Sequence, residues 1–204
     1  MKEFWDQRYA ELEYAYGHQP NVFFQKELMK LSEVGKILLP ADGEGRNGVF
    51  AAQLGWDVYS FDISEEGKKK AEKLAEKRNV VLNYQVGDFL DMDYQQNSFE
   101  VVSLVYSHFP PKIREIYHQR IVKLLKPGGK IIMEGFSTKH LEYNSVNPEV
   151  GGPKDEALLF SKEMVLKDFN DFEIVSLEQE EVDLNEGNYH IGTGNVIRFV
   201  GIKK

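Results

Sequence analysis

The sequence predicts an α/β fold in which one seven-stranded, mostly parallel sheet carries helices on both faces and ends in an antiparallel hairpin. Between residues 36 and 136, short β-branched or aromatic runs alternate with charge-rich helical stretches, as in parallel sheets covered by helices. Two later strand-like runs, residues 172–184 and 195–202, have no helical stretch between them, so we expect them to pair as the hairpin. A chain of 204 residues fits one domain, 1–204, better than two.

The expected elements follow one another in a regular order. Residues 1–31 read as a helical segment that is broken where Gly17 and Pro20 interrupt the pattern. Strands are expected at residues 36–40, 57–62, 80–86, 99–105 and 130–136. Helices are expected at residues 44–54, 64–78 and 111–125, with Gly55 ending the first, Ser64 capping the second and Pro111 opening the third. An irregular insertion, residues 137–160, is followed by a short helix at 161–169.

The composition narrows the class of function. The formal net charge is −8, and an acidic surface repels phosphate backbones, so we expect no nucleic-acid partner. The chain has no cysteine, which excludes disulfides and a cysteine nucleophile, and its histidines lack ligand-like spacing, so we expect no metal. No apolar run is long enough to cross a membrane and residues 1–6 lack the apolar core of a signal peptide, so the expected location is cytoplasmic. The choice between a monomer and a homodimer stays open.

A glycine-rich turn joins the first expected strand to the helix after it. Residues 41–48 read Ala-Asp-Gly-Glu-Gly-Arg-Asn-Gly, in which Gly43, Gly45 and Gly48 form the pattern G-x-G-x-x-G. Glycines at this place let the backbone turn sharply and approach a ligand at the N-terminus of a helix, as in dinucleotide-binding sites. The pattern alone is also compatible with a tight turn that binds nothing.

Two further strand ends carry groups of the kind that bind nucleosides. Asp62 ends the second strand, near the spacing at which an acidic residue meets ribose hydroxyls, although a helix N-cap is an alternative role. Gly87, Asp88 and Phe89 follow the third strand, where an Asp can accept a hydrogen bond from an adenine amino group beside an aromatic neighbour. Because the carboxyl ends of parallel strands meet at one edge of a sheet, the sequence predicts a single binding crevice there.

These motifs, in this order, resemble class I S-adenosylmethionine-dependent methyltransferases. The matching segments are Gly43–Asn47, Phe61–Ser64, Gly87–Asp88, Asn97–Val102 and Leu125–Gly129. The likeness extends to small bacterial proteins of the tellurite-resistance and thiopurine methyltransferase group through Trp5–Tyr9, Tyr16–Asn21, Glu134–Phe136, Gly151–Asp155 and Leu184–Gly187. It implies a Rossmann-like sheet, S-adenosylmethionine as cofactor, a lid formed by residues 1–31 and an insertion, 137–160, over the active site.

The pattern and the resemblance together give a set of candidate cofactor-binding residues. They are Tyr16, Ala41, Asp42, Gly43, Gly45, Arg46, Asn47, Asp62, Ile63, Gly87, Asp88, Phe89 and Val105. Two positions depart from the family's pattern, because Leu39 stands where an acidic residue is usual and Ala41 stands for the first glycine. We expect the backbone of residues 41–43, or Asp42, to compensate.

The candidate catalytic residues are His108 and Arg46. A sulfonium methyl group is already activated, so alignment and desolvation suffice and a strong base is optional. His108 follows the fourth strand and can bind or deprotonate an acceptor, or be a histidine held by backbone at a helix entry. Arg46 can hold an anionic acceptor or be an ordinary ion-paired arginine, and we expect His190 to be structural or exposed. The expected acceptor is a small, soft nucleophile: a tellurite- or selenite-type oxyanion or a thiol.

Two other functions stay open on the sequence alone. An NAD-dependent oxidoreductase would use Gly43, Gly45, Gly48 and Asp62, but it does not account for Gly87–Asp88, and no substrate domain is evident. A non-catalytic S-adenosylmethionine-binding module would use the same cofactor residues. The lid-like N-terminus and the insertion favour a closed reaction chamber over such a module.

Overall fold

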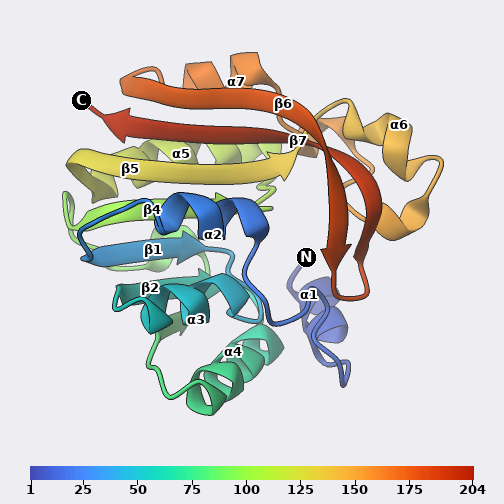
Figure 1. Cartoon of the computed structure of the whole chain (residues 1–204), viewed down its shortest axis with the longest axis horizontal. Coiled ribbons are helices and arrows are strands. Elements are labelled where there is room, and N and C mark those ends of the chain that lie inside the picture. Colours follow the sequence, from blue (N-terminus) through green and yellow to red (C-terminus); the bar gives the residue numbers. More distant parts are fainter.

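A computed structural model describes residues 1–204 and contains one seven-stranded sheet with the strand order β3-β2-β1-β4-β5-β7-β6 (Figure 1). The strands are β1 (Lys36–Pro40), β2 (Asp57–Asp62), β3 (Asn83–Val86), β4 (Phe99–Val105), β5 (Leu125–Phe136), β6 (Phe172–Glu186) and β7 (His190–Lys203). The first five strands are parallel, and β7 pairs antiparallel with both β5 and β6. The predicted fold class is confirmed.

Helices cover both faces of this sheet. They are α1 (Lys2–Tyr9), α2 (Val22–Leu28), α3 (Arg46–Gln53), α4 (Glu65–Lys77), α5 (Pro111–Leu124), α6 (His140–Asn144) and α7 (Lys162–Asp168). Side chains alternate along β1: Ile37 and Leu39 pack with residues of α2 and α3, whereas Leu38 packs with residues of α5 and α7. Both faces of the strand are therefore buried, which explains its continuous apolar sequence. None of the helices has the length and apolar character needed to span a membrane.

The β6–β7 hairpin is longer than predicted and extends past the edge of the sheet. Its strands pair up to Glu186 and His190, whereas the pairing of β5 with β7 stops at Val196. The tip therefore passes the carboxyl ends of the parallel strands and reaches the N-terminal segment, where Figure 1 shows it beside α1. Gly187 at the tip packs against the backbone of Ala15.

Three segments differ from the prediction. The third strand begins at Asn83 rather than at residue 80, because the N–H of Val80 still bonds to a carbonyl of α4. The fifth strand begins at Leu125, which pairs with Phe99 before a register shift. Residues 137–160 are not wholly irregular, because they contain α6 and two 3-10 turns, η2 (Pro148–Val150) and η3 (Glu156–Leu158).

Candidate active site

The predicted strand ends lie side by side at the carboxyl edge of the sheet. The N–H of Gly87, after β3, donates to the carbonyl oxygen of Asp62, at the end of β2, at 3.0 Å. Ile63 and Val105 are half-buried at the ends of β2 and β4. In the strand order, the turn that follows β1 lies between the ends of β2 and β4. The loops that follow β1, β2, β3 and β4 therefore all lie at one edge of the sheet.

The turn after β1 needs unusual backbone conformations. Ala41, Gly43 and Gly45 have φ values of +54°, +56° and +79°, in the left-handed region. Packing requires both glycines, because a Cβ on Gly43 would lie 2.6 Å from the hydroxyl of Tyr9 and one on Gly45 would lie 2.5 Å from Cβ of Ala71 in α4. Ala41 keeps its Cβ in this region at a cost of roughly 1–2 kcal/mol. The turn is thus a strained, closely packed element at the N-terminus of α3.

Asp62 is buried at the end of β2 with a hydrogen bond to each carboxylate oxygen. Oδ2 accepts from the N–H of Gly43 at 3.1 Å, and Oδ1 accepts from the N–H of Ser64 at 3.0 Å. Burial raises the pKa of Asp62 to about 6, because desolvation penalises the charged form more than these bonds favour it. Ser64 caps α4 through its hydroxyl, so Asp62 is free of the N-cap role. A carboxylate offers about four acceptor sites, so these two hydrogen bonds do not use its full capacity.

The side chain of Asp42 points away from the crevice, contrary to expectation. Its Oδ2 accepts from the hydroxyl of Ser60 at 2.8 Å, and a Cβ on Gly48 of α3 would come within 2.5 Å of the same oxygen. The carboxyl group therefore lies between β2 and α3. Burial raises the pKa of Asp42 to about 7, and its Oδ1 is closed to solvent without a hydrogen-bond partner. The Asp42 side chain therefore does not take the place of the acidic residue for which Leu39 stands at the end of β1.

Asp88 and Phe89, after β3, have different surroundings. Asp88 is exposed, and its Oδ1 accepts from the N–H of Leu90 and from the hydroxyl of Tyr117, both at 2.8 Å. Phe89 is 1% exposed and stacks on Phe61 in the core, with ring centroids 4.8 Å apart. The expectation that the Phe89 ring packs against an adenine is corrected, because aromatic packing holds it beneath the strand end.

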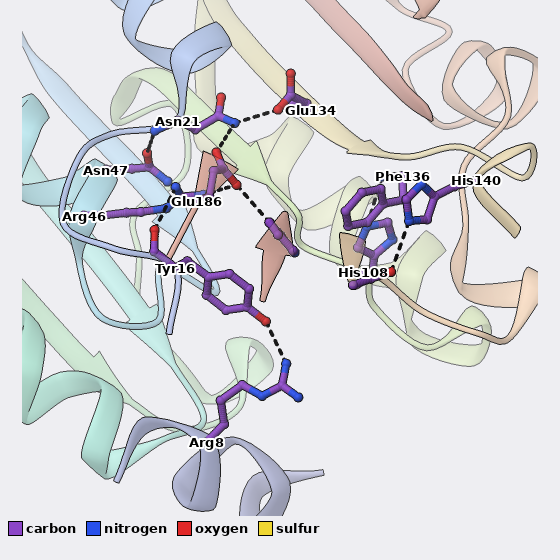
Figure 2. A network of polar contacts seen from close by, with 12 residues as sticks. Arg8, Tyr16, Asn21, Arg46, Asn47, His108, Glu134, Phe136, His140 and Glu186 are labelled. Carbon is purple, nitrogen blue, oxygen red and sulfur yellow. Dashed lines mark hydrogen bonds and ion pairs between the residues drawn. The ribbon is translucent and has the colours of Figure 1, made fainter. Parts of the chain in front are cut away.

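A network of polar contacts surrounds the N-terminus of α3 (Figure 2). Arg46, in the first turn of this helix, donates to Glu186 at the tip of β6 at 3.0 Å and to the carbonyl oxygen of Tyr16 at 3.3 Å. The hydroxyl of Tyr16 accepts in turn from Arg8 of α1 at 3.1 Å. The N-terminal segment, α3 and the hairpin tip therefore meet at one place.

Asn21 connects this network to the sheet. Its Nδ2 donates to Glu134 on β5 at 2.6 Å and to Glu186 at 3.1 Å. Its N–H donates to the Asn47 side-chain oxygen at 2.9 Å, and its own Oδ1 caps α2 by accepting from Phe24. Asn21 was not among the predicted site residues, although it ends the segment Tyr16–Asn21 that carried part of the family resemblance.

His190 lies inside the network, although it was expected to be structural or exposed. It is 4% exposed, and its Nδ1 is 2.9 Å from the carboxylate of Glu186. Because a carboxylate accepts, Nδ1 carries the proton and Nε2 is the free ring nitrogen. Burial lowers the pKa of His190, which keeps the ring neutral. Its ring centroid is 4.5 Å from that of Tyr16 and 4.6 Å from that of Tyr106.

His108 has no free ring nitrogen. Its Nδ1 is 2.7 Å from the carbonyl oxygen of Leu158, and its Nε2 accepts from the N–H of Phe136 at 3.2 Å. Burial lowers the pKa of His108 to about 4, so the ring is neutral. This geometry corrects the expectation that His108 binds or deprotonates the acceptor, and favours its role as a backbone-bound histidine at a helix entry.

Comparison with known proteins matches part of the chain to a family model and the whole chain to solved structures of the same fold. A family model described as a methyltransferase domain matches residues 37–129. The chain is similar to a probable thiol methyltransferase 2 of Arabidopsis thaliana, with 29% identity over 154 residues that cover 72% of this chain and 63% of the relative. The chain thus spans less than two thirds of that relative's length.

Solved structures share the fold over the whole chain. One of them is described as "Conversion of a Disulfide Bond into a Thioacetal Group during Echinomycin Biosynthesis". Its TM-score is 0.81 at 17% identity, and the match covers 100% of this chain and 92% of that one. TehB from Haemophilus influenzae has a TM-score of 0.70 at 15% identity and covers 100% of this chain and 67% of its own. The methyltransferase-domain match extends from β1 into β5, and the likeness to these solved structures shows the fold of the whole chain.

Proposed function

We propose that this protein binds S-adenosylmethionine at the carboxyl edge of the sheet and transfers its methyl group to a small thiol. The observation that carries the proposal is the buried pairing of His190 with Glu186 beside the N-terminus of α3. A neutral imidazole that a carboxylate orients is suited to take a proton from a weakly acidic nucleophile. The rings of Tyr16 and Tyr106 pack against the His190 ring, with centroids 4.5 and 4.6 Å away.

The cofactor supplies a methyl group that its sulfonium sulfur already activates. We assign the ribose diol to Asp62, whose carboxylate has acceptor capacity left after its bonds to Gly43 and Ser64. The backbone of residues 41–45 would follow the methionine portion. The remaining proposed contacts are Ile63, Gly87 and Asp88 toward the adenine, and Tyr16, Arg46, Asn47 and Val105 toward the methionine end.

In the proposed step the acceptor sulfur attacks the methyl carbon. The new bond between sulfur and the methyl carbon forms as the bond from that carbon to the sulfonium sulfur breaks, and the electron pair stays on the departing sulfur. The thiol proton passes to Nε2 of His190, and Glu186 stabilises the resulting imidazolium through Nδ1. Thiols have pKa values near 8.5, within reach of an imidazole base.

Two comparisons support sulfur as the acceptor atom. The curated relative from Arabidopsis is described as a probable thiol methyltransferase. The structure from echinomycin biosynthesis belongs to the conversion of a disulfide into a thioacetal. The net charge of −8 weighs against a polyanionic acceptor such as a nucleic acid.

A chalcogen oxyanion is the second candidate acceptor. The sequence resemblance to tellurite-resistance proteins supports it, and so does Arg8, whose guanidinium has no carboxylate partner and lies beside Tyr16. A half-buried cation beside the polar network would favour a small anion.

Calorimetry and turnover test these proposals on the full chain. We expect S-adenosylmethionine and its demethylated product to bind and NAD not to bind. Methylation of 2-mercaptoethanol, hydrosulfide, selenite and tellurite is then followed by mass spectrometry of the dissolved and volatile methylated products. Methylated thiols support the first candidate, and methylated oxyanions alone support the second. Cofactor binding without any turnover would instead indicate a non-catalytic module, and binding of NAD alone an oxidoreductase.

A further inference from the structure

The first 20 residues are held to the rest of the protein by few apolar contacts. Of these residues only Tyr9 and Ala15 are buried, and neither belongs to a hydrophobic cluster of the core. Phe23 and Phe24, in the helix that follows, are by contrast members of such a cluster. Segments with few buried apolar contacts open more easily than the core does. Polar contacts therefore decide how firmly this segment is closed.

One of these polar contacts comes from Glu44, which lies between two glycines of the turn after β1. Its side chain is only 3% exposed. Its Oε2 accepts from the N–H of Ala15 at 2.8 Å, and its Oε1 accepts from Nζ of Lys70 in α4, also at 2.8 Å. The same ammonium group donates to the carbonyl oxygen of Glu13 at 2.6 Å. Charge-assisted bonds of this kind are about twice as strong as neutral ones, so the buried pair anchors the backbone of residues 13–15.

Ala15 is also bonded to the tip of the β6–β7 hairpin. Its carbonyl oxygen accepts from the N–H of Asn188 at 2.9 Å. One residue of the N-terminal segment is thus bonded through its N–H to the glycine turn and through its carbonyl group to the hairpin. The segment cannot move away from the carboxyl edge of the sheet unless the bond between Ala15 and Glu44 breaks.

The turn that holds Ala15 is also the turn that we assign to the cofactor. The N–H of Gly43, next to Glu44, donates to Asp62 at 3.1 Å, so the backbone proposed to meet the ligand and the carboxylate that holds the segment belong to one turn. We infer that Glu44 is a latch: its bonds to Ala15 and Lys70 keep the N-terminal segment closed over the cofactor, and S-adenosylhomocysteine leaves only after they break.

This inference rests on the proposed cofactor site and describes how that site exchanges its ligand. Glu44 is a positioning residue, because it acts on the ligand through the segment that it holds. Entry and exit of the ligand both require the segment to open, so a latch slows both steps. Its loss should speed both, whereas loss of a direct contact to the ligand would speed exit alone.

Surface plasmon resonance of the full chain with S-adenosylhomocysteine measures the two rates. We expect Glu44→Ala to raise the dissociation rate at least about fivefold and the association rate at least about twofold. Hydrogen exchange of residues 13–16 should also be faster in the free variant than in the free wild type. The matched control is Glu72→Ala, because Glu72 pairs with Lys68 on the same helix α4 at 3.7 Å but has a side chain that is 58% exposed. The control should leave both rates and the exchange unchanged.

Glu44→Gln keeps the test decisive if Glu44→Ala does not fold. The amide oxygen of glutamine can still accept from the N–H of Ala15, but it lacks the charge that pairs with Lys70. Both ligand rates in Glu44→Gln should therefore lie between those of the wild type and those expected for Glu44→Ala.

Three results would overturn the inference. They are wild-type rates in whichever Glu44 variant folds, a faster dissociation in which residues 13–16 exchange as in the wild type, and an equal effect in Glu72→Ala. A wild-type protein that does not bind S-adenosylhomocysteine would overturn the proposed function itself, and that result is visible before any variant is made.

Discussion

Arg46 and Glu186 are 140 residues apart in the sequence, and their side chains form an ion pair at 3.0 Å. The two side chains are only 9% and 12% exposed. The pair joins the first turn of α3, which follows the glycine turn, to the tip of the β6–β7 hairpin. Because both charges are desolvated, removal of either one leaves the other unpaired in a buried place.

Glu186→Gln should therefore destabilise the protein. We expect the free energy of unfolding at pH 7 to fall by about 3–5 kcal/mol, the usual cost of breaking a buried pair. Coulombic attraction to Arg46 and the bond from His190 outweigh burial and hold the pKa of Glu186 at about 2, below the ordinary 4.5. A depressed carboxyl pKa contributes stability above pH 4.5 that is lost as pH falls through 2, so the gap between wild type and variant should close over that range.

Urea unfolding at several pH values measures this gap. Glu180→Gln is the control, because Glu180 pairs with Arg198 at 2.8 Å but its side chain is 45% exposed. Exposed pairs contribute about 0–1 kcal/mol. Equal losses in the two variants would show that the Arg46–Glu186 pair is no more important than a surface contact.

Asp62→Asn should weaken cofactor binding while the fold survives. The carboxylate would lose two charge-assisted hydrogen bonds to the ribose, each worth roughly 1.5–3 kcal/mol, so affinity for S-adenosylhomocysteine should fall at least about tenfold at pH 7.5. The pKa of Asp62, raised by burial to about 6, predicts that wild-type affinity also falls as pH drops through 6. The variant should lack that pH dependence.

Calorimetry between about pH 5 and 8 provides the measurement. Asp57→Asn, at the exposed start of the same strand, is the matched control and should bind like wild type. A folded Asp62→Asn protein with wild-type affinity would remove Asp62 from the cofactor site.

The elements of the fold were predictable because their signals are local. A few neighbouring residues are enough to recognise the apolar runs of β1, β2 and β4. The same holds for Ser64, which caps α4, and for Pro111, which opens α5. The network at α3 was not predictable, since it depends on contacts such as the one between Asn21 and Glu186, 165 residues apart. His190 joins this network only because the hairpin is longer than predicted and its tip passes the carboxyl ends of the parallel strands.

The direction of a side chain was the other unpredictable feature. Asp42 and Phe89 occupy the expected turns, but one points beneath α3 and the other into the core. A turn's sequence indicates where its backbone lies, whereas the side chain goes where the neighbouring elements leave a polar partner or an apolar surface. For Asp42 the partner is Ser60, and for Phe89 the surface is Phe61.

Asp42→Asn should stabilise the protein at high pH. The pKa of Asp42 is raised from 3.8 to about 7 by burial, and a raised carboxyl pKa contributes stability below 3.8 that is lost as pH rises through 7. Asparagine keeps the shape without the charge, so its advantage in unfolding free energy should grow between pH 4 and 7, to about 2–4 kcal/mol. Urea unfolding measures it, with the exposed Asp183→Asn as control. A gap independent of pH would mean that Asp42 has the same pKa in the folded and the unfolded protein.

His190→Gln and His108→Gln should separate catalysis from stability. His190→Gln removes the proposed base, and we expect kcat for 2-mercaptoethanol to fall by about 10²–10⁴ with little change in S-adenosylhomocysteine affinity. His108→Gln disturbs the bonds to Leu158 and Phe136, so it should cost about 1–3 kcal/mol of stability and reduce kcat far less. The reverse pattern, with activity lost in His108→Gln and kept in His190→Gln, would restore His108 as the catalytic candidate.

Gly187→Ala should loosen the lid from the hairpin. Gly187 has φ of +59°, and a Cβ there would collide with the carbonyl group of Ala15 and lie 2.5 Å from the nitrogen of Gly17. Backbone atoms at both places cannot move without shifting the lid segment. We propose that this segment closes over the cofactor, so the variant should bind S-adenosylhomocysteine more weakly. In the wild type, the bound ligand should slow the hydrogen exchange of residues 5–21. In the variant, that slowing should be smaller.

Gly128→Ala separates this effect from the general cost of a side chain in the left-handed region. Gly128 has φ of +78°, but an added Cβ meets nothing within 4 Å. Both variants should lose about 1 kcal/mol for the backbone conformation, and Gly187→Ala should lose a further 1–3 kcal/mol for the collision. Only Gly187→Ala should change ligand affinity and the exchange of residues 5–21. If the two variants lost affinity equally, or if the ligand left the exchange of residues 5–21 unchanged in the wild type, the segment would be part of the permanent core instead of a lid.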